Sequence, residues 1–321
     1  MRAVEVTQFG GPEVLVATES PEPVPGPGQV VVAVAFVDTL FMDIQLRSGA
    51  WQDFVPVRPP YIPGDGVAGT VVRVGPGVDP AWAGRRVVAL TQGVGAYAEQ
   101  AVAELDQVVV VPDGLDLQIA AALVHDGRTA CALAESTGMR RGEWVMVLAA
   151  AGGLGLLLVQ LAQAAGARVI GAARGSRKLK VIREHGAEFA VDYSDVGWTG
   201  QVAAATGGRG PDVVFDGAGG SIGSQALRLT APGGRFSAHG APSGEFADVD
   251  QVRGREVTVK GIEQAQLDSG DGSRVTARAL AEATAGRIRP LVGLTLPLEK
   301  AGEAHAAIEA RAVVGKTLLV I

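Results

Sequence analysis

Cysteine and histidine are scarce in this chain. Its 321 residues include one cysteine, Cys131, and four histidines. A single cysteine excludes an internal disulfide, a four-cysteine zinc lobe and a zinc site with two thiolates. The histidines stand in separate segments without ligand spacing, at His125, His185, His239 and His305. We therefore expect no bound metal, and a small zinc site on His125 and Asp126 is the remaining alternative.

Long apolar runs and basic runs are also missing. Only 19% of the residues are charged, and the net charge is −6. This balance argues against nucleic acid as a partner. No apolar run approaches the length of a membrane span, and the first residues, MRAVEV, lack the apolar core of a signal peptide. We expect a cytoplasmic protein that binds neither nucleic acid nor membrane.

The composition that remains is that of a well-buried α/β protein, with 47% hydrophobic residues and 45 glycines. Up to about residue 120, valine-rich strands alternate with Gly and Pro turns, which predicts a small barrel or sandwich. The predicted strands include residues 29–37, 66–75, 84–90 and 107–112. The Pro-rich segment 20–28 reads as a loop between two strands.

From about residue 123, helices and strands alternate, which predicts a doubly wound parallel sheet. Strands are expected at 189–193, 212–219 and 234–240, and a long helix at 273–288. A last strand, KTLLVI, is expected to return to the first domain. The predicted domains are 1–122, 123–258 and 259–321, with the middle one inserted.

The stretch AAAGGLG, residues 149–155, lies between an apolar strand and a helix, and a second strand follows. This strand–turn–helix–strand context favours a dinucleotide site over a tight turn without a ligand. Ala150 occupies the first position of G-x-G-x-x-G. Gly152 would let the backbone approach a pyrophosphate, and Gly155 would let the helix pack closely on the strand. The helix N-terminus would offer N–H groups to the phosphates.

The second strand of this unit ends in ARGSRK, with no carboxylate at its tip. An acid there would bind the ribose of NAD, whereas guanidinium groups suit a 2′-phosphate. Arg174, Ser176, Arg177 and Lys178 therefore predict NADPH as the cofactor. The alternative is that these cations only solvate the start of the next helix.

Three longer segments carry a family resemblance: MRAVEVTQFGGPEVL, AAAGGLGLLLVQLAQAAGARVIGAAR and EARAVVGKTLLVI. With them, the whole chain resembles the zinc-free quinone oxidoreductase (ζ-crystallin-like) branch of the medium-chain dehydrogenase/reductase superfamily. The resemblance implies an α/β fold in which a doubly wound Rossmann domain is inserted in a β-rich GroES-like catalytic domain. It also implies an NADPH-dependent reductase of quinones or α,β-unsaturated carbonyls.

The resemblance assigns cofactor roles to single residues. Asp43 would lie near the nicotinamide, Thr129 near the phosphate-ribose region and Tyr193 beside the adenosine phosphate. The pyrophosphate turn and the 2′-phosphate clamp would be Gly152, Gly153, Leu154, Gly155, Arg174, Ser176 and Lys178. The ends of two further strands, Asp216, Gly217, His239 and Gly240, would face the cofactor crevice, and Arg311 would lie near the cofactor.

Three positions depart from the family pattern. Leu40 replaces an asparagine, Trp51 replaces a tyrosine, and Gly66 replaces an acid in PG-x-E-x-x-G. These changes make the expected substrate pocket more apolar. Trp51, Phe41 and Phe54 are candidate walls for a flat apolar substrate, and core packing is an equally good interpretation.

Thr39, Asp43 and Tyr97 are the candidate catalytic residues. Thr39 or Tyr97 would orient a carbonyl group, although Tyr97 can equally pack locally in a strand. The cofactor would supply the chemistry, and the protein would position it against a small apolar quinone or enone. The alternatives are an enoyl or enone reductase of secondary metabolism and a non-catalytic NADPH-binding protein. A homodimer is expected, because the edge of the parallel sheet needs a cover.

Overall fold

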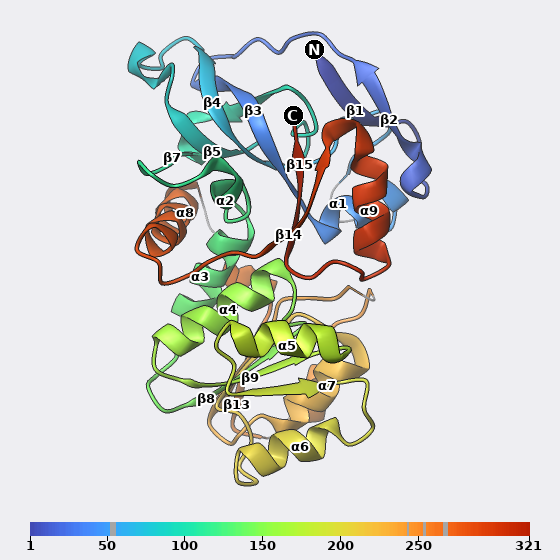
Figure 1. Ribbon diagram of the computed structural model, residues 1–321, viewed down its shortest axis with the longest axis vertical. Coiled ribbons are helices and arrows are strands. Elements are labelled where there is room, and N and C mark those ends of the chain that lie inside the picture. Colours follow the sequence, from blue (N-terminus) through green and yellow to red (C-terminus); the bar gives the residue numbers. More distant parts are fainter. Residues whose placement is uncertain (52–55, 243, 253–254, 266–268) are drawn as a thin grey trace. The chain divides into compact units, whose positions relative to one another are not determined.

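The computed structural model describes residues 1–51, 56–242, 244–252, 255–265 and 269–321 (Figure 1). The chain forms two compact units. The first unit comprises residues 1–128, 269–284 and 290–321, and the second comprises 129–268 and 285–289. These limits stand a few residues beyond the predicted domain limits at 122 and 258, which remain predictions. Among the described residues, no helix is long and apolar enough to cross a membrane.

The first unit is built on a seven-stranded sheet in the order β14-β15-β3-β4-β5-β7, with β6 paired to β3. Its strands are β3 (Gln29–Thr39), β4 (Gly66–Val74), β5 (Arg86–Leu90), β6 (Gln100–Glu104), β7 (Val108–Val110), β14 (Val292–Pro297) and β15 (Lys316–Val320). A separate antiparallel pair is formed by β1 (Arg2–Val6) and β2 (Leu15–Glu19). Because β15 pairs with β3, the last strand completes the sheet that the first part of the chain begins.

Valine dominates the core of this sheet, since branched side chains pack well on a pleated surface. The register of β3 against β4 shifts twice, so β3 bends along its length. The helices of the unit are α1 (Phe41–Ser48), α2 (Leu117–Ala121), α8 (Ser269–Thr284) and α9 (Ala301–Glu309). Helix α3 (Asp126–Thr137) begins in this unit and continues into the second one. The sequence predicted it from residue 123, but residues 122–125 form a turn instead.

The second unit holds a parallel six-stranded sheet in the order β10-β9-β8-β11-β12-β13. The strands are β8 (Trp144–Leu148), β9 (Arg168–Ala173), β10 (Phe189–Asp192), β11 (Val213–Asp216), β12 (Gly234–Ala238) and β13 (Val257–Lys260). The intervening helices are α4 (Gly153–Ala164), α5 (Ser176–Glu184), α6 (Trp198–Ala205) and α7 (Gly220–Leu229). The strand order reverses direction between β8 and β11. The predicted α/β class, with a doubly wound Rossmann sheet, is confirmed.

Candidate active site

The glycine turn joins β8 to α4 at the point where the strand order reverses, which is where open α/β sheets bind ligands. Gly152 is the N-cap of α4, and no side chain caps the first N–H groups of this helix. Uncapped N–H groups at a helix N-terminus suit an anion. The turn therefore has the backbone arrangement that a pyrophosphate requires.

Gly152 and Gly155 of this turn are glycines for different reasons. A Cβ at Gly155 would lie 2.6 Å from the Ala149 carbonyl oxygen and 2.7 Å from the Ala150 Cα, so the close helix packing excludes any side chain. A Cβ at Gly152 would meet nothing nearer than the Ala149 oxygen at 3.6 Å. Its φ of −80° suits any residue. The protein's own packing does not require glycine at 152, so space for a ligand explains it better.

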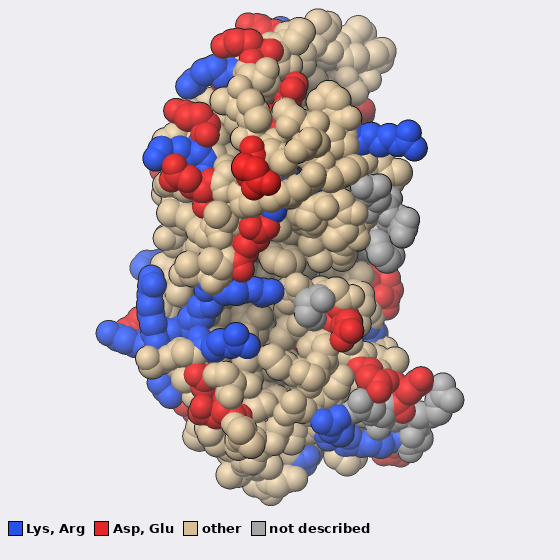
Figure 2. Space-filling view, turned by 90° about the vertical axis from the view of Figure 1, so that its right-hand side faces the viewer, with Lys and Arg blue, Asp and Glu red and all other residues tan. Residues whose placement is uncertain are grey.

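The predicted 2′-phosphate residues follow β9 directly. Arg174 and Ser176 are exposed, and Lys178 is half-buried in the first turn of α5. Lys and Arg side chains gather at the height of α5 in Figure 2. An acid that we did not predict contacts this segment. Asp192, at the end of β10, accepts hydrogen bonds from the N–H of Gly175 (2.7 Å) and of Ser194 (2.9 Å).

Asp192 is already engaged by these donors. Burial raises its pKa, but the bonds from Ser194 and Gly175 and the nearby Arg174 hold the pKa below its ordinary value. Asp192 thus fixes the turn that presents Arg174. The side chains expected to bind a 2′-phosphate thus follow the end of β9, and the side chain of Arg174 is exposed.

The turns after β11 and β12 approach each other closely. A Cβ at Gly240 would lie 2.7 Å from the Gly217 Cα. Asp216 is fully buried and accepts the N–H groups of Ala218 (2.9 Å) and Gly219 (2.8 Å), so it shapes its own turn. Burial raises its pKa to about 6. Burial also lowers the pKa of His239 to about 4, which leaves a neutral ring at the end of β12.

The other predicted cofactor residues are more scattered. Thr129 and Tyr193 are half-buried in the second unit, where the Tyr193 N–H donates to the Ala173 carbonyl. Arg311 and Asp43 belong to the first unit. The Arg311 guanidinium lies over the Phe41 ring, 5.1 Å from its centroid. Their roles toward the cofactor remain predictions.

The three candidate catalytic residues are all buried in the first unit. Thr39, Asp43 and Tyr97 are at most 3% exposed. Asp43 accepts the Leu40 N–H (2.8 Å) at the start of α1. The Tyr97 hydroxyl lies 3.2 Å from Asp43 Oδ2 and 2.9 Å from His305 Nε2. Sequence reasoning placed Asp43 and Tyr97 in one site, and the structure joins them directly.

Burial sets the protonation states of Asp43, Tyr97 and His305. It raises the pKa of Asp43 to about 7, aided by the neighbouring Asp38, and it lowers the pKa of His305 to about 3. The pKa of Tyr97 also rises well above its ordinary value, because of burial and of Asp43. The three side chains thus form a buried, hydrogen-bonded support, and none of them presents a surface to a ligand.

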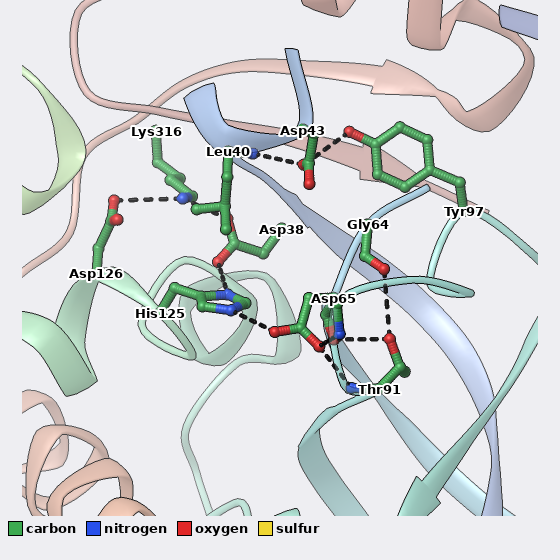
Figure 3. Close-up of polar contacts among 11 residues, drawn as sticks. Asp38, Leu40, Asp43, Gly64, Asp65, Thr91, Tyr97, His125, Asp126 and Lys316 are labelled. Atoms are coloured by element: carbon green, nitrogen blue, oxygen red, sulfur yellow. Dashed lines mark hydrogen bonds and ion pairs between the residues drawn. The ribbon is translucent and has the colours of Figure 1, made fainter. Parts of the chain in front are cut away.

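A second cluster lies beside this support, and Figure 3 shows it. The His125 ring lies between two carboxylates, with Nδ1 2.9 Å from Asp38 Oδ2 and Nε2 3.0 Å from Asp65 Oδ2. Lys316 forms ion pairs with Asp38 and, at 3.3 Å, with Asp126. We call these five residues the charged chain. Its members come from β3, the segment before β4, the turn before α3, α3 itself and β15.

The charges of Asp38, Asp65, His125 and Lys316 support one another, whereas burial raises the pKa of Asp126 in spite of Lys316. Burial would lower the pKa of His125, but hydrogen bonds to Asp38 and Asp65 raise it to about 10, so the ring is an imidazolium at neutral pH. Burial would raise the pKa values of Asp38 and Asp65, but Lys316 and His125 hold them low. Lys316 keeps its charge, since Asp126 and Asp38 raise its pKa to about 12 against burial.

Gly66 explains how the imidazole fits. It stands opposite Asp38 in the β3–β4 register, and a Cβ at Gly66 would lie 2.7 Å from His125 Nδ1. The departure from the family pattern at this position therefore makes room for the ring. Leu40 is the N-cap of α1, and Trp51 is half-buried. Phe54 lies outside the described residues.

The small zinc site on His125 and Asp126 stays an untested alternative. In this structure both nitrogens of His125 lie at hydrogen-bond distance from carboxylates of Asp38 and Asp65. Cys131 is buried elsewhere, within α3. In the described ranges, no group of three His, Cys, Asp or Glu residues could hold a metal ion.

Sequence reasoning missed Asp65, Lys316 and His305, and it considered His125 only as a possible zinc ligand beside Asp126. One signal was available. Asp38 and Lys316 are single charged residues within apolar strands, where an unpaired charge is costly. Each therefore predicts an oppositely charged partner, but the sequence does not show that Asp38 and Lys316 pair with each other.

The comparisons with known proteins agree with this architecture. Residues 26–113 match the family model of the alcohol dehydrogenase GroES-like domain, and residues 153–278 match that of the zinc-binding dehydrogenases. The quinone oxidoreductase of Sus scrofa is 31% identical over 324 residues, covering 100% of this chain and 98% of the relative. A 2-haloacrylate reductase of Burkholderia is 30% identical over 334 residues, covering 99% and 98%.

A solved structure extends the likeness to three dimensions. The Escherichia coli quinone oxidoreductase, determined in complex with NADPH, superposes with a TM-score of 0.93 at 27% identity, covering all of both chains. The resemblance read from the sequence motifs is thus confirmed. The chain belongs to the medium-chain dehydrogenase/reductase superfamily, in its zinc-free quinone oxidoreductase branch, and is an oxidoreductase.

Proposed function

We propose that this protein uses NADPH to reduce quinones or α,β-unsaturated carbonyl compounds, by hydride transfer without zinc. Relatives named for quinones and for 2-haloacrylate, an α,β-unsaturated acid, support both acceptor classes. The NADPH complex of the bacterial neighbour supports the cofactor. The zinc-free branch to which the protein belongs supports zinc-independent chemistry.

The observation that carries the proposal is the open space at Gly152, beside an uncapped helix N-terminus and the cations after β9. The turn 152–155 would hold the pyrophosphate, and Arg174, Ser176 and Lys178 would hold the 2′-phosphate. Bound NADPH supplies a hydride. The protein itself would hold the cofactor and orient the acceptor.

A fluorescence titration with NADPH and with NADH tests the cofactor site. We expect the wild type to bind NADPH more tightly, and Arg174→Glu to lose about tenfold or more in affinity for NADPH alone, because it removes a charge-assisted contact. Arg183→Glu is the matched control, since Arg183 is also exposed and donates to the Ala190 carbonyl of the same unit. Equal losses with both cofactors would contradict the 2′-phosphate assignment.

Steady-state NADPH oxidation with a panel of benzoquinones and enones tests the activity. Turnover with at least one class is the expected result. Saturable binding of NADPH without turnover would instead support a non-catalytic NADPH-binding protein. A marked preference for enones would favour an enoyl or enone reductase.

We assign Asp43 and Tyr97 a positioning role at the start of α1, because both are buried and hydrogen-bonded to each other. Thr39 is buried at the end of β3, just before this helix. Tyr97→Phe removes only the hydroxyl. We expect it to lower kcat with little change in NADPH affinity, and unchanged kcat would contradict the assignment.

We also propose a homodimer in the cytoplasm. Among the described strands of the parallel sheet, β10 and β13 are the edges, each with a single neighbour, and a sheet edge favours pairing with a second copy. Light scattering of the purified protein would give the mass of the assembly, and a monomeric mass would contradict the dimer.

A further inference from the structure

Reduction of a quinone or an enone consumes a proton as well as a hydride. Hydride addition leaves an anion on the acceptor, and this anion must take one proton to give the hydroquinone or the saturated carbonyl compound. The inference below rests on the proposed function and concerns the source of that proton. A donor must carry a proton at neutral pH and must reach the surface.

The histidines differ in this respect. His239 and His305 are neutral, since burial lowers their pKa values to about 4 and about 3. His185 caps the end of α5 and directs Nδ1 to the Val181 carbonyl, 2.7 Å away. His125 is the protonated ring, and 17% of its side chain is exposed.

The two carboxylates that hold His125 are not equivalent. Asp38, on Nδ1, is completely buried and paired with Lys316. Asp65, on Nε2, is 13% exposed, and its other oxygen accepts the N–H groups of Thr91 (2.9 Å) and Gly93 (2.7 Å). The ring is therefore anchored through Nδ1 on the buried side, and Nε2 faces the partly exposed side.

We propose that His125 is the proton donor of the reduction and that it gives the proton from Nε2. In the structure Asp65 accepts the N–H of Nε2, so the acceptor anion has to replace Asp65 Oδ2 at this hydrogen. The N–H bond of Nε2 then breaks as an O–H or C–H bond forms on the acceptor anion, and the ring becomes neutral. Water that reaches the exposed edge of Asp65 returns one proton to Nε2. Asp38 and Lys316 are positioning residues, which keep the ring oriented and charged.

Two features show that the structure is shaped around the His125 ring. Gly66 leaves the space that the ring occupies, and a methyl group there would collide with Nδ1. Ionisable groups of both signs surround the ring. The ionisable groups that face it or its partners are Asp38 in β3, Asp43 in α1, Asp65 before β4, Asp126 and Arg128 in α3, and Lys316 in β15.

The first test uses His125→Gln with a series of benzoquinones, from methoxy- to chloro-substituted. The more acidic the hydroquinone product, the less its anion needs a donor. We expect turnover to fall about 100-fold for the least acidic product, and the loss to shrink toward a few-fold for the most acidic. A purely structural role would lower all the rates by one common factor, and that result would overturn the proposal.

His185→Gln is the matched control, because it makes the same substitution in the other unit. We expect wild-type rates across the series. If the wild type reduces no acceptor at all, the proposed function itself fails. If the wild type is active and His125→Gln is uniformly slow, only the assignment of His125 fails.

Asp65→Asn provides a second variant that preserves shape and removes one charge. The His125 ring should then lose its proton at a lower pH, so the alkaline fall of the reduction rate should move to lower pH. Ring-nitrogen NMR of the cofactor-free protein should show the same shift of the His125 titration. A rate profile and a ring titration that stay at the wild-type pH would overturn the proposal.

Discussion

The two units differ in how many acidic and basic side chains they bury. In the described part of the first unit, the buried acidic and basic side chains are Asp38, Asp43, Arg47, His305 and Lys316, whereas in that of the second unit Asp216 is the one such side chain. The second unit presents backbone N–H groups and exposed cations around a glycine turn. The first unit encloses charges that neutralise one another. A dinucleotide site made of backbone groups would need little buried charge, whereas the proton donor proposed above would depend on a buried ion-pair system.

Removing the buried ammonium should give the largest effect. Lys316→Met leaves Asp38 and Asp126 without their shared cation, and we expect a loss of about 3–5 kcal/mol in the free energy of unfolding. Denaturation of Lys180→Met is the comparison, because Lys180 forms only an exposed i,i+4 pair at 3.9 Å on α5. That variant should stay within about 0.5 kcal/mol of the wild type. Similar losses in both would erase the contrast between the units.

The pH dependence of stability should come next. The pKa of His125 rises from 6.5 to about 10 on folding, so its stabilisation is complete below pH 6.5 and is lost as pH rises toward 10. For a partly exposed ring we expect a decline of about 3 kcal/mol across this window. Unfolding midpoints measured from pH 6.5 to 10 should fall less steeply in His125→Gln. An equally steep fall would show that other groups cause it.

Gly152 and Gly155 should respond differently to substitution by alanine. Gly155→Ala places a methyl group 2.6 Å from a carbonyl oxygen, and we expect a cost of about 1–3 kcal/mol in stability. Gly152→Ala should leave stability nearly unchanged and should weaken NADPH binding about tenfold or more. Calorimetric unfolding and NADPH titration of both variants separate the two roles. Unchanged NADPH affinity in Gly152→Ala would argue for a structural turn.

The smallest effect should be at Arg311. Arg311→Ala removes the guanidinium over Phe41, which is worth about 0.5–1 kcal/mol at an exposed site. Thermal unfolding measures this loss. If the predicted cofactor role is correct, NADPH affinity should fall as well, and normal affinity would limit Arg311 to the contact with Phe41.

The same contrast decides what the sequence could predict. Within the second unit, the turn 149–155, the strand ends and the cations at 174–178 are local patterns with fixed spacing. The fold of this unit could therefore be predicted from the sequence, and candidate cofactor residues could be named. In the first unit, Asp38, Asp65, His125 and Lys316 come from four distant segments. No periodicity links them, because only the pairing of β15 with β3 brings Lys316 to Asp38. Gly66 was noticed as a missing acid, but its reason is a ring that only the fold brings there.

The pairing of β15 with β3 also bears on how the protein is made. On the ribosome, Asp38 emerges early, but its counter-ion Lys316 emerges only after the whole second unit has been synthesised. The second unit is nearly continuous in sequence and can fold while translation proceeds. The first unit has to wait, with β3 lacking one neighbour and a carboxylate lacking its cation. The domain whose synthesis starts first is thus the last to be completed, and its final strand brings the charge that closes it.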